Sequence, residues 1–181
     1  VVHRDLKPLN VMVGPFGVVK VMDWGVAFKK DEGVRQTLAV AGSGAPAPGD
    51  VMGTPAYMSP EQARGDSWRI DERADVFGLG GILCAILTSL PPYPGTSTRK
   101  VHARAARADL TDAFARLDAS PAPRELVRLT KRCLAPHPGA RPRDAGEVTA
   151  ALTSYLDSDL RQAARDLVLF FELSPDLFCI A

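Results

Sequence analysis

From residue 59 onward, apolar residues recur at intervals of three and four, which is the spacing of amphipathic helices. Ser59 suits the N-cap of a short first helix, because Pro60 can occupy the first helical position and Gln62 can complete a capping box. A second helix is expected to begin after Asp71, and its residues as far as Leu90 are apolar on almost every face, which predicts burial. Further amphipathic helices are predicted at about 97–108, 122–135 and 144–157.

The N-terminal part of the chain has a different pattern. Two short β-type runs, 10–13 and 18–22, are separated by Gly14-Pro15-Phe16-Gly17, so they predict a β-hairpin. No periodicity is sustained from residue 29 to residue 53, and residues 42–49 are all Gly, Ser, Ala or Pro, which predicts a flexible loop. The whole pattern therefore predicts a mainly α fold with one short β-hairpin.

A third pattern lies near the end of the chain. Five apolar residues follow one another at intervals of 4, 3, 4 and 3, namely Leu156, Leu160, Ala163, Leu167 and Phe170. This is a heptad seam of about two heptads, fewer than the three or four that identify a coiled coil. Two interpretations stay open: a dimer contact through this C-terminal helix, or an amphipathic helix packed on another part of the same chain.

Composition and charge narrow the class of protein. The 181 residues are 46% apolar, as in a globular chain with a core, and their net charge of +1 argues against nucleic-acid binding by bulk electrostatics. The longest apolar stretch, Val76–Leu87, is too short to span a membrane. Cys84, Cys133 and Cys179 are far apart and form neither a metal-type cluster nor a disulfide framework. The chain begins Val1-Val2-His3-Arg4-Asp5, with charged residues where a signal peptide would be apolar. Together with the lack of a disulfide framework in the sequence, this predicts a cytoplasmic location.

The first ten residues contain the run His3-Arg4-Asp5-Leu6-Lys7-Pro8-Leu9-Asn10. This run resembles the catalytic loop of protein kinases, in the form typical of Ser/Thr kinases. Phosphoryl transfer to a hydroxyl needs an acceptor for the hydroxyl proton, a cation at the γ-phosphate and oxygen ligands for Mg²⁺. The resemblance implies that Asp5 is the catalytic base, that Lys7 contacts the transferring phosphate of ATP and that Asn10 holds a magnesium ion.

A second motif, Asp23-Trp24-Gly25, follows 18 residues after Asp5, across the predicted hairpin. It resembles the metal-binding Asp-Phe-Gly of protein kinases, which implies that Asp23 is a ligand of the Mg²⁺ between the β- and γ-phosphates. Trp24 departs from the usual Phe. It keeps a large aromatic ring at the position whose packing distinguishes active from inactive kinases, so activity is expected to persist.

Residues 53–61 resemble the end of the kinase activation segment, with Ser-Pro-Glu in place of the usual Ala-Pro-Glu. The resemblance implies that Thr54 contacts both Asp5 and Lys7. It also implies that residues 56–58 shape the pocket for the substrate residue after the phosphate acceptor. The sequence thus predicts that this distant segment contributes to the catalytic site.

Other implied contacts would hold the catalytic loop in shape. Glu61 would pair with Arg141, for which the alternative is a solvated loop arginine. Asp75 would accept backbone N–H groups of His3 and Arg4, for which the alternative is an acid favoured by the helix dipole in a first turn. His3 is expected to be structural rather than a general base, and Arg4 is expected to meet a phosphorylated activation segment.

The activation segment, residues 23–61, is long, and its middle is rich in Gly, Ala and Pro. We therefore expect it to be disordered when it is unphosphorylated. Thr37 and Ser43 are the candidate phosphorylation sites, and a phosphate on either one would pair with Arg4. Thr54 is a poorer phosphorylation site, because its hydroxyl is needed at the catalytic centre.

Residues 1–157 as a whole resemble the C-terminal lobe of a eukaryotic-like (Hanks-type) Ser/Thr protein kinase of the bacterial kind. The resemblance implies the C-terminal lobe of the α+β kinase fold, ATP and Mg²⁺ as cofactors, and a protein substrate. The Gly-rich loop and phosphate-binding lysine of such kinases would lie before Val1, so we expect a fragment that is inactive alone. Residues 158–173 are expected to form a helical linker, and 174–181 resemble the start of a PAS sensor domain.

Two alternatives belong to other classes of protein. One is a non-catalytic signalling or scaffold module of the pseudokinase type, and the other is an unrelated helical interaction domain. Pseudokinases usually lack one of the catalytic or metal-binding residues, whereas this chain retains Asp5, Lys7, Asn10 and Asp23. An unrelated domain would require five matches to the kinase pattern to be accidental, namely His3-Arg4-Asp5, Asp23-Trp24-Gly25, Ser59-Pro60-Glu61, Asp75 and Arg141. The sequence therefore favours an active Ser/Thr kinase as the parent protein.

Overall fold

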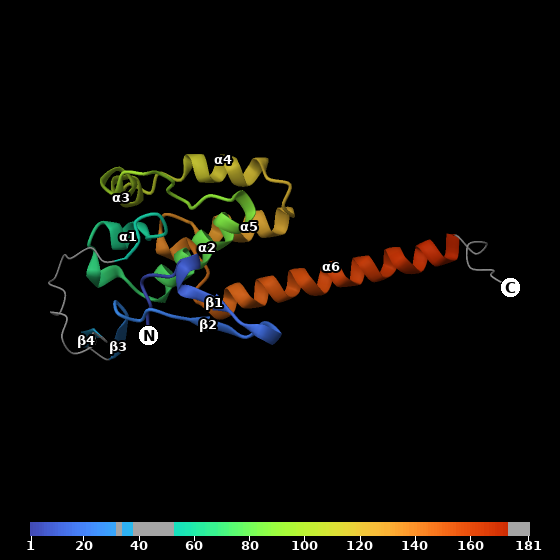
Figure 1. The fold of residues 1–181 in the computed structure, drawn as a ribbon, viewed down its shortest axis with the longest axis horizontal. Coiled ribbons are helices and arrows are strands. Elements are labelled where there is room, and N and C mark those ends of the chain that lie inside the picture. The colour runs from blue at the N-terminus through green and yellow to red at the C-terminus, as the bar shows by residue number, and fades with distance from the viewer. Residues whose placement is uncertain (32–33, 38–52, 174–181) are drawn as a thin grey trace.

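The structure is a computed structural model that describes residues 1–31, 34–37 and 53–173. The helices pack into one lobe, from which the last helix projects, and two hairpins lie near the N-terminus (Figure 1). The strands are β1 (Val11–Val13), β2 (Val19–Val21), β3 (Phe28–Asp31) and β4 (Val34–Thr37). The α-helices are α1 (Pro60–Ala63), α2 (Glu72–Thr88), α3 (Thr98–Ala106), α4 (Thr111–Ala119), α5 (Arg124–Cys133) and α6 (Ala145–Leu173).

The mainly α fold predicted from the sequence is confirmed, with one helix more than expected. Helices α1, α2, α3 and α5 match predicted segments, and Ser59 and Gln62 form the predicted capping box of α1. Asp71 caps α2 by accepting the backbone N–H of Arg73 at 2.9 Å. Helix α4 was not predicted, because it is short and begins after Leu110, which offers no side-chain cap.

The predicted hairpin is also confirmed, but a second one was missed. Strands β1 and β2 pair antiparallel, with Val11 opposite Val21. Strands β3 and β4 pair antiparallel in the segment where no periodicity was found, with Phe28 opposite Thr37. The charged residues of β3 hide the alternation of apolar and polar side chains that identifies a strand. Residues 38–52, on which the predicted flexible loop falls, lie outside the described part of the chain.

Helix α2 runs through the middle of the lobe and fits its neighbours closely. Two of its glycines make this possible, since a Cβ atom on Gly78 would lie 2.8 Å from the Cβ of Leu6, and one on Gly80 would lie 2.6 Å from the Cβ of Cys133. The prediction of burial holds for the faces toward Leu6 and α5, whereas Ile86 is 70% exposed. Close backbone approach therefore seats the N-terminal loop directly on α2. Within the described ranges, no helix combines the length and hydropathy needed to cross a bilayer.

Helix α6 continues unbroken through residue 157, where a boundary between lobe and linker was predicted (Figure 1). Its first turns pack on the lobe through Val148 and Leu152, which join the cluster around Leu129. The first two residues of the predicted seam, Leu156 and Leu160, are 55% and 68% exposed. Neither leucine is therefore buried against the part of the chain that the structure describes, and the dimer contact remains a prediction.

A buried ion pair joins helix α1 to the loop before helix α6. The Arg141 guanidinium donates to both carboxylate oxygens of Glu61, at 2.6 and 2.9 Å, and the two side chains are 0% and 1% exposed. Arg141 also donates to the backbone oxygens of Arg73, Ala135 and Pro136 at 2.7–3.1 Å. The predicted pair is confirmed, and the alternative of a solvated loop arginine is wrong. Burial disfavours the Glu61 carboxylate, but the hydrogen bonds and charge of Arg141 outweigh it and lower its pKa.

We predict that Arg141→Met destabilises the 181-residue chain by about 3–5 kcal/mol, because it leaves the Glu61 carboxylate buried without its partner. The matched control is Arg143→Met, since Arg143 is 75% exposed beside Asp144, and this change should cost less than about 0.5 kcal/mol. Urea unfolding at pH 7 measures both changes. Because the folded-state pKa of Glu61 is lowered, the pair stabilises the fold above pH 4.5 and loses its effect as the pH falls through the folded-state pKa. The gap between wild type and Arg141→Met should therefore shrink on acidification, and equal losses in the two variants at pH 7 would contradict the account.

Candidate active site

One carboxylate of helix α2 holds the turn at the start of the chain. Asp75 accepts the backbone N–H groups of His3 at 2.7 Å and of Arg4 at 2.8 Å. Arg4 has a left-handed φ of 70°, which is unfavourable for a residue with a Cβ and persists only where the surroundings hold it. Burial raises the pKa of Asp75, although the two N–H groups oppose this rise. The predicted contact of Asp75 with the His3–Arg4 turn is confirmed.

Asp5, Lys7 and Thr54 form a closed ring of hydrogen bonds. Lys7 Nζ donates to Asp5 Oδ2 and to Thr54 Oγ1, each at 2.6 Å, and the backbone N–H of Thr54 donates to Asp5 Oδ1 at 2.8 Å. The Asp5 and Lys7 side chains are only 10% and 17% exposed. The predicted contacts of Thr54 are confirmed, so the end of the activation segment is attached directly to the catalytic loop.

One further side chain, Asn10, contacts this ring, and the backbone before Asp23 is attached to Asn10. The buried Asn10 uses its Nδ2 to donate to the backbone oxygen of Asp5 at 2.9 Å and to Asp5 Oδ2 at 3.2 Å, which leaves its side-chain oxygen for another partner. The backbone oxygen of Asn10 accepts the N–H of Met22 at 2.8 Å, and the exposed Asp23 follows directly. The structure thus brings Asn10 and the segment that carries Asp23 together.

An amide oxygen and a carboxylate are the hard ligands that Mg²⁺ prefers, and Mg²⁺ usually keeps water and phosphate oxygens as its other ligands. Among the described residues there is no group of three or more His, Cys, Asp or Glu side chains that could hold a metal by themselves. Asn10 and Asp23 therefore fit a magnesium ion that is shared with a phosphorylated ligand. They do not fit a metal held by protein ligands alone.

His3 connects the catalytic loop to the segment that carries Asp23. Its Nδ1 accepts the backbone N–H of Asp5 at 3.2 Å, and its Nε2 lies 2.9 Å from the backbone oxygen of Met22. Since a carbonyl oxygen can only accept, Nε2 carries the proton and Nδ1 does not. His3 is buried, and both of its ring nitrogens contact backbone groups, which fits the structural role expected from the sequence.

Arg4 lies beside the start of the activation segment. Its Nε donates to the backbone oxygen of Val26, and its guanidinium carbon lies 5.1 Å from the centre of the Phe28 ring. The backbone of Phe28 pairs with Val2 on one side and stands opposite Thr37 on the other. Strand β4 therefore places the backbone of Thr37 opposite a residue that Arg4 contacts, whereas Ser43 lies outside the described residues.

Two positioning residues were missed by the sequence analysis. Gln62 was assigned only a cap, but its Nε2 also donates to the backbone oxygen of Arg4 at 2.7 Å. Gly53 has a φ of 118°, and a Cβ there would lie 3.1 Å from the same oxygen. A glycine directly before Thr54 was a usable signal for a tight backbone approach, whereas the second contact of Gln62 depends on where a distant loop lies.

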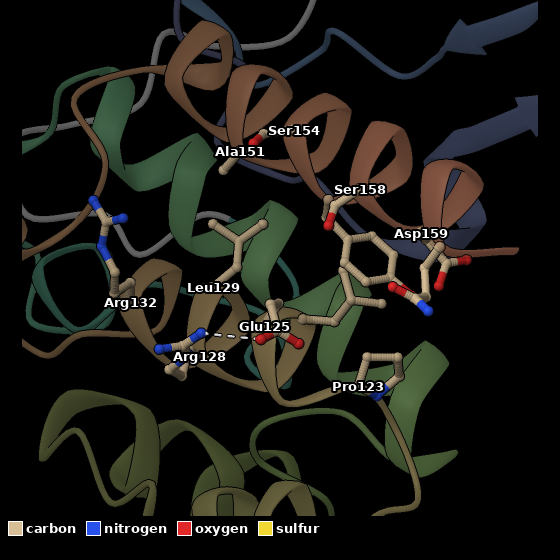
Figure 2. A pocket seen from close by; sticks show the side chains of 12 residues that line it. Pro123, Glu125, Arg128, Leu129, Arg132, Ala151, Ser154, Ser158 and Asp159 are labelled. Carbon is tan, nitrogen blue, oxygen red and sulfur yellow. Dashed lines mark hydrogen bonds and ion pairs between the residues drawn. The ribbon is translucent and has the colours of Figure 1, made fainter. Parts of the chain in front are cut away.

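An open groove of about 780 Å³ lies between α5 and α6, and Figure 2 shows the side chains that line it. Leu129 and Ala151 form part of its floor, and charged side chains such as Arg128, Arg132 and Asp159 lie around it. None of its lining residues belongs to the ring around Asp5 or to the metal-ligand candidates. The groove is therefore separate from the candidate active site.

Comparison with known sequences identifies the family. The family described as protein kinase domain matches residues 1–153. The chain is 36% identical over 167 residues, 92% of its length, to the serine/threonine-protein kinase PknB of Mycobacterium tuberculosis (strain ATCC 25177 / H37Ra). It is 38% identical over 153 residues, 84% of its length, to the serine/threonine-protein kinase PknB of Mycolicibacterium smegmatis. The matched regions are 25% and 22% of these two relatives, so the chain spans about a quarter of their length.

We predict that the Thr54 hydroxyl is needed for phosphoryl transfer, because it holds Lys7 beside Asp5. Thr54→Val keeps the backbone N–H bond and the size of the side chain but removes the acceptor for Lys7. In the full-length protein it should lower kcat about 100-fold, the effect of a small misplacement of a reacting group. The measurement is the rate of peptide phosphorylation by each variant. Thr54→Ser, the matched control, should keep most of the activity. Equal kcat values for the Val and Ser variants would show that the hydroxyl has no such role.

Proposed function

The chain belongs to the protein kinase family, and from this premise we propose that the protein containing it transfers the γ-phosphate of ATP to Ser and Thr hydroxyls of protein substrates. One observation carries the proposal: Asp5, Lys7 and Thr54 form a ring of hydrogen bonds 2.6–2.8 Å long. The names of the mycobacterial relatives, which are Ser/Thr kinases, support the same activity and a bacterial type of kinase.

The proposed roles follow from what each group can do at its position. Asp5 accepts the proton of the substrate hydroxyl through Oδ1, which accepts the N–H of Thr54 and keeps a second lone pair. Oδ2 already accepts from Lys7 and Asn10. Lys7, held 2.6 Å from Asp5 and from Thr54, places a positive charge where a phosphate oxygen approaches the hydroxyl. Thr54 fixes the direction of the Lys7 side chain.

The cofactors we propose are ATP and Mg²⁺. Asn10 and Asp23 would hold the metal, which when bound neutralises charge on the phosphates during transfer. Exposed apolar side chains of the neighbouring hairpin, among them Met12 at 50% and Met22 at 38%, offer a surface for the flat base of a nucleotide.

Phosphorylation of the activation segment is the regulation we propose. A phosphate adds about −1.5 to −2 charges at pH 7 and pairs well with a guanidinium group. Arg4 contacts the ring of Phe28, and Phe28 stands opposite Thr37, which supports Thr37 as the modified residue. Ser43 stays a second prediction. Mass spectrometry of the active protein would locate the phosphate.

The domain organisation is also a proposal. We assign residues 1–157 to the C-terminal lobe of a kinase and 158–173 to a linker that continues helix α6. The exposed seam residues Leu156 and Leu160 support a dimer contact through this helix. The start of a PAS domain at 174–181 falls outside the described residues and stays a prediction. The free, buried thiols of Cys84 and Cys133 support a reducing, cytoplasmic location.

The test is formation of phosphoserine and phosphothreonine from labelled ATP by the full-length protein. Asp5→Asn keeps the size of the side chain but removes the base, so the rate should fall about 10²–10⁴-fold. Asp118→Asn is the matched control, since the Asp118 side chain is 64% exposed and forms a surface ion pair with Lys131. Equal rates for Asp5→Asn and wild type would overturn the proposal. A wild type without any transfer would favour the pseudokinase alternative.

A further inference from the structure

Trp24 stands where the kinase motif has Phe, and it makes a contact that Phe cannot make. Its indole Nε1–H donates to the backbone oxygen of Val21 at 3.0 Å. Val21 is the last residue of β2 and stands opposite Val11, the residue after Asn10. The bond therefore ties the aromatic ring back to the end of the hairpin, across the two residues Met22 and Asp23.

The backbone enclosed by this bond needs to be held in place. Asp23 has a left-handed φ of 60°, which is unfavourable for a residue with a Cβ. Before it, Met22 is held through both backbone groups, since its N–H donates to Asn10 and its oxygen accepts from His3. After it, the indole bond holds Trp24. Asp23 thus lies between two fixed points, and the second exists because residue 24 is a tryptophan.

Burial alone does not fix the orientation of the Trp24 ring, because the residue is 48% exposed. The ring meets the His3 ring edge to face, with 4.7 Å between the ring centres and 65° between the planes. A phenyl ring keeps this kind of contact but offers no N–H group. The hydrogen bond to Val21 is therefore the part of the arrangement that is specific to Trp24.

We propose that the indole N–H of Trp24 is a positioning group for the Asp23 carboxylate, and that it sets how tightly the site holds Mg²⁺ together with a nucleotide. The inference rests on the proposed function, in which Asp23 is a metal ligand. Trp24 acts on the metal only through Asp23. Loss of the indole N–H group therefore weakens metal-dependent binding of the nucleotide and leaves metal-free binding unchanged.

Trp24→Phe in the full-length protein tests the inference through equilibrium binding of ADP at a series of Mg²⁺ concentrations. The Mg²⁺ concentration at half-maximal binding should rise about 3- to 10-fold, the effect of one ordinary hydrogen bond. Binding of ADP without Mg²⁺ should stay unchanged. Trp68→Phe, at an exposed tryptophan of the loop after α1, is the matched control and should behave as wild type.

A second replacement separates positioning from packing. Benzothienylalanine at residue 24 keeps the size and shape of the side chain and carries sulfur in place of the N–H group, so it should reproduce the Mg²⁺ shift of Trp24→Phe. Wild-type Mg²⁺ dependence in either variant would overturn the inference, as would an equal loss of binding with and without Mg²⁺. If Trp24→Phe shows the expected shift in Mg²⁺ dependence but the wild type transfers no phosphate, the proposed function fails and the inference stands.

Discussion

The ion pair between Glu61 and Arg141 is the contact on which the arrangement of the lobe depends. It is fully buried, and Arg141 reaches backbone oxygens of α2 and of the loop after α5 as well as Glu61. Helix α1, which carries Glu61, also carries Gln62, whose amide donates to the backbone oxygen of Arg4. A single guanidinium thus fixes the position of a helix of four residues, and that helix in turn holds the catalytic loop.

The catalytic loop is held from two sides, and this double attachment shapes the candidate active site. Asp75 of α2 binds the backbone N–H groups of His3 and Arg4 from one side, and Gln62 binds the oxygen of Arg4 from the other. The unfavourable backbone conformation of Arg4 is stable only because of such restraints. Asp5 follows directly, and its carboxylate accepts from Lys7 and from the backbone of Thr54.

Many contacts of this site could be predicted from the sequence, because its motifs resemble those of protein kinases and the resemblance implies which residues lie close together. The contacts of Thr54, of Asp75 and of Glu61 with Arg141 all connect residues far apart in the chain, and each was implied by a motif. The second role of Gln62 and the indole bond of Trp24 could not be predicted, since both depend on where a backbone oxygen lies after folding. Local pattern also failed in β3, where charged side chains hide a strand, and in α4, which has no side-chain cap.

The central claim is that Asp5 and Lys7 act as one catalytic unit. The most direct test is the single-turnover rate of phosphate transfer in the full-length protein for Asp5→Asn, Lys7→Met and the double variant. If the two residues act together, the double variant should be about as slow as the slower single variant, because either change already disables the unit. Rate losses that multiply in the double variant, or a single variant that reacts as fast as wild type, would contradict the claim.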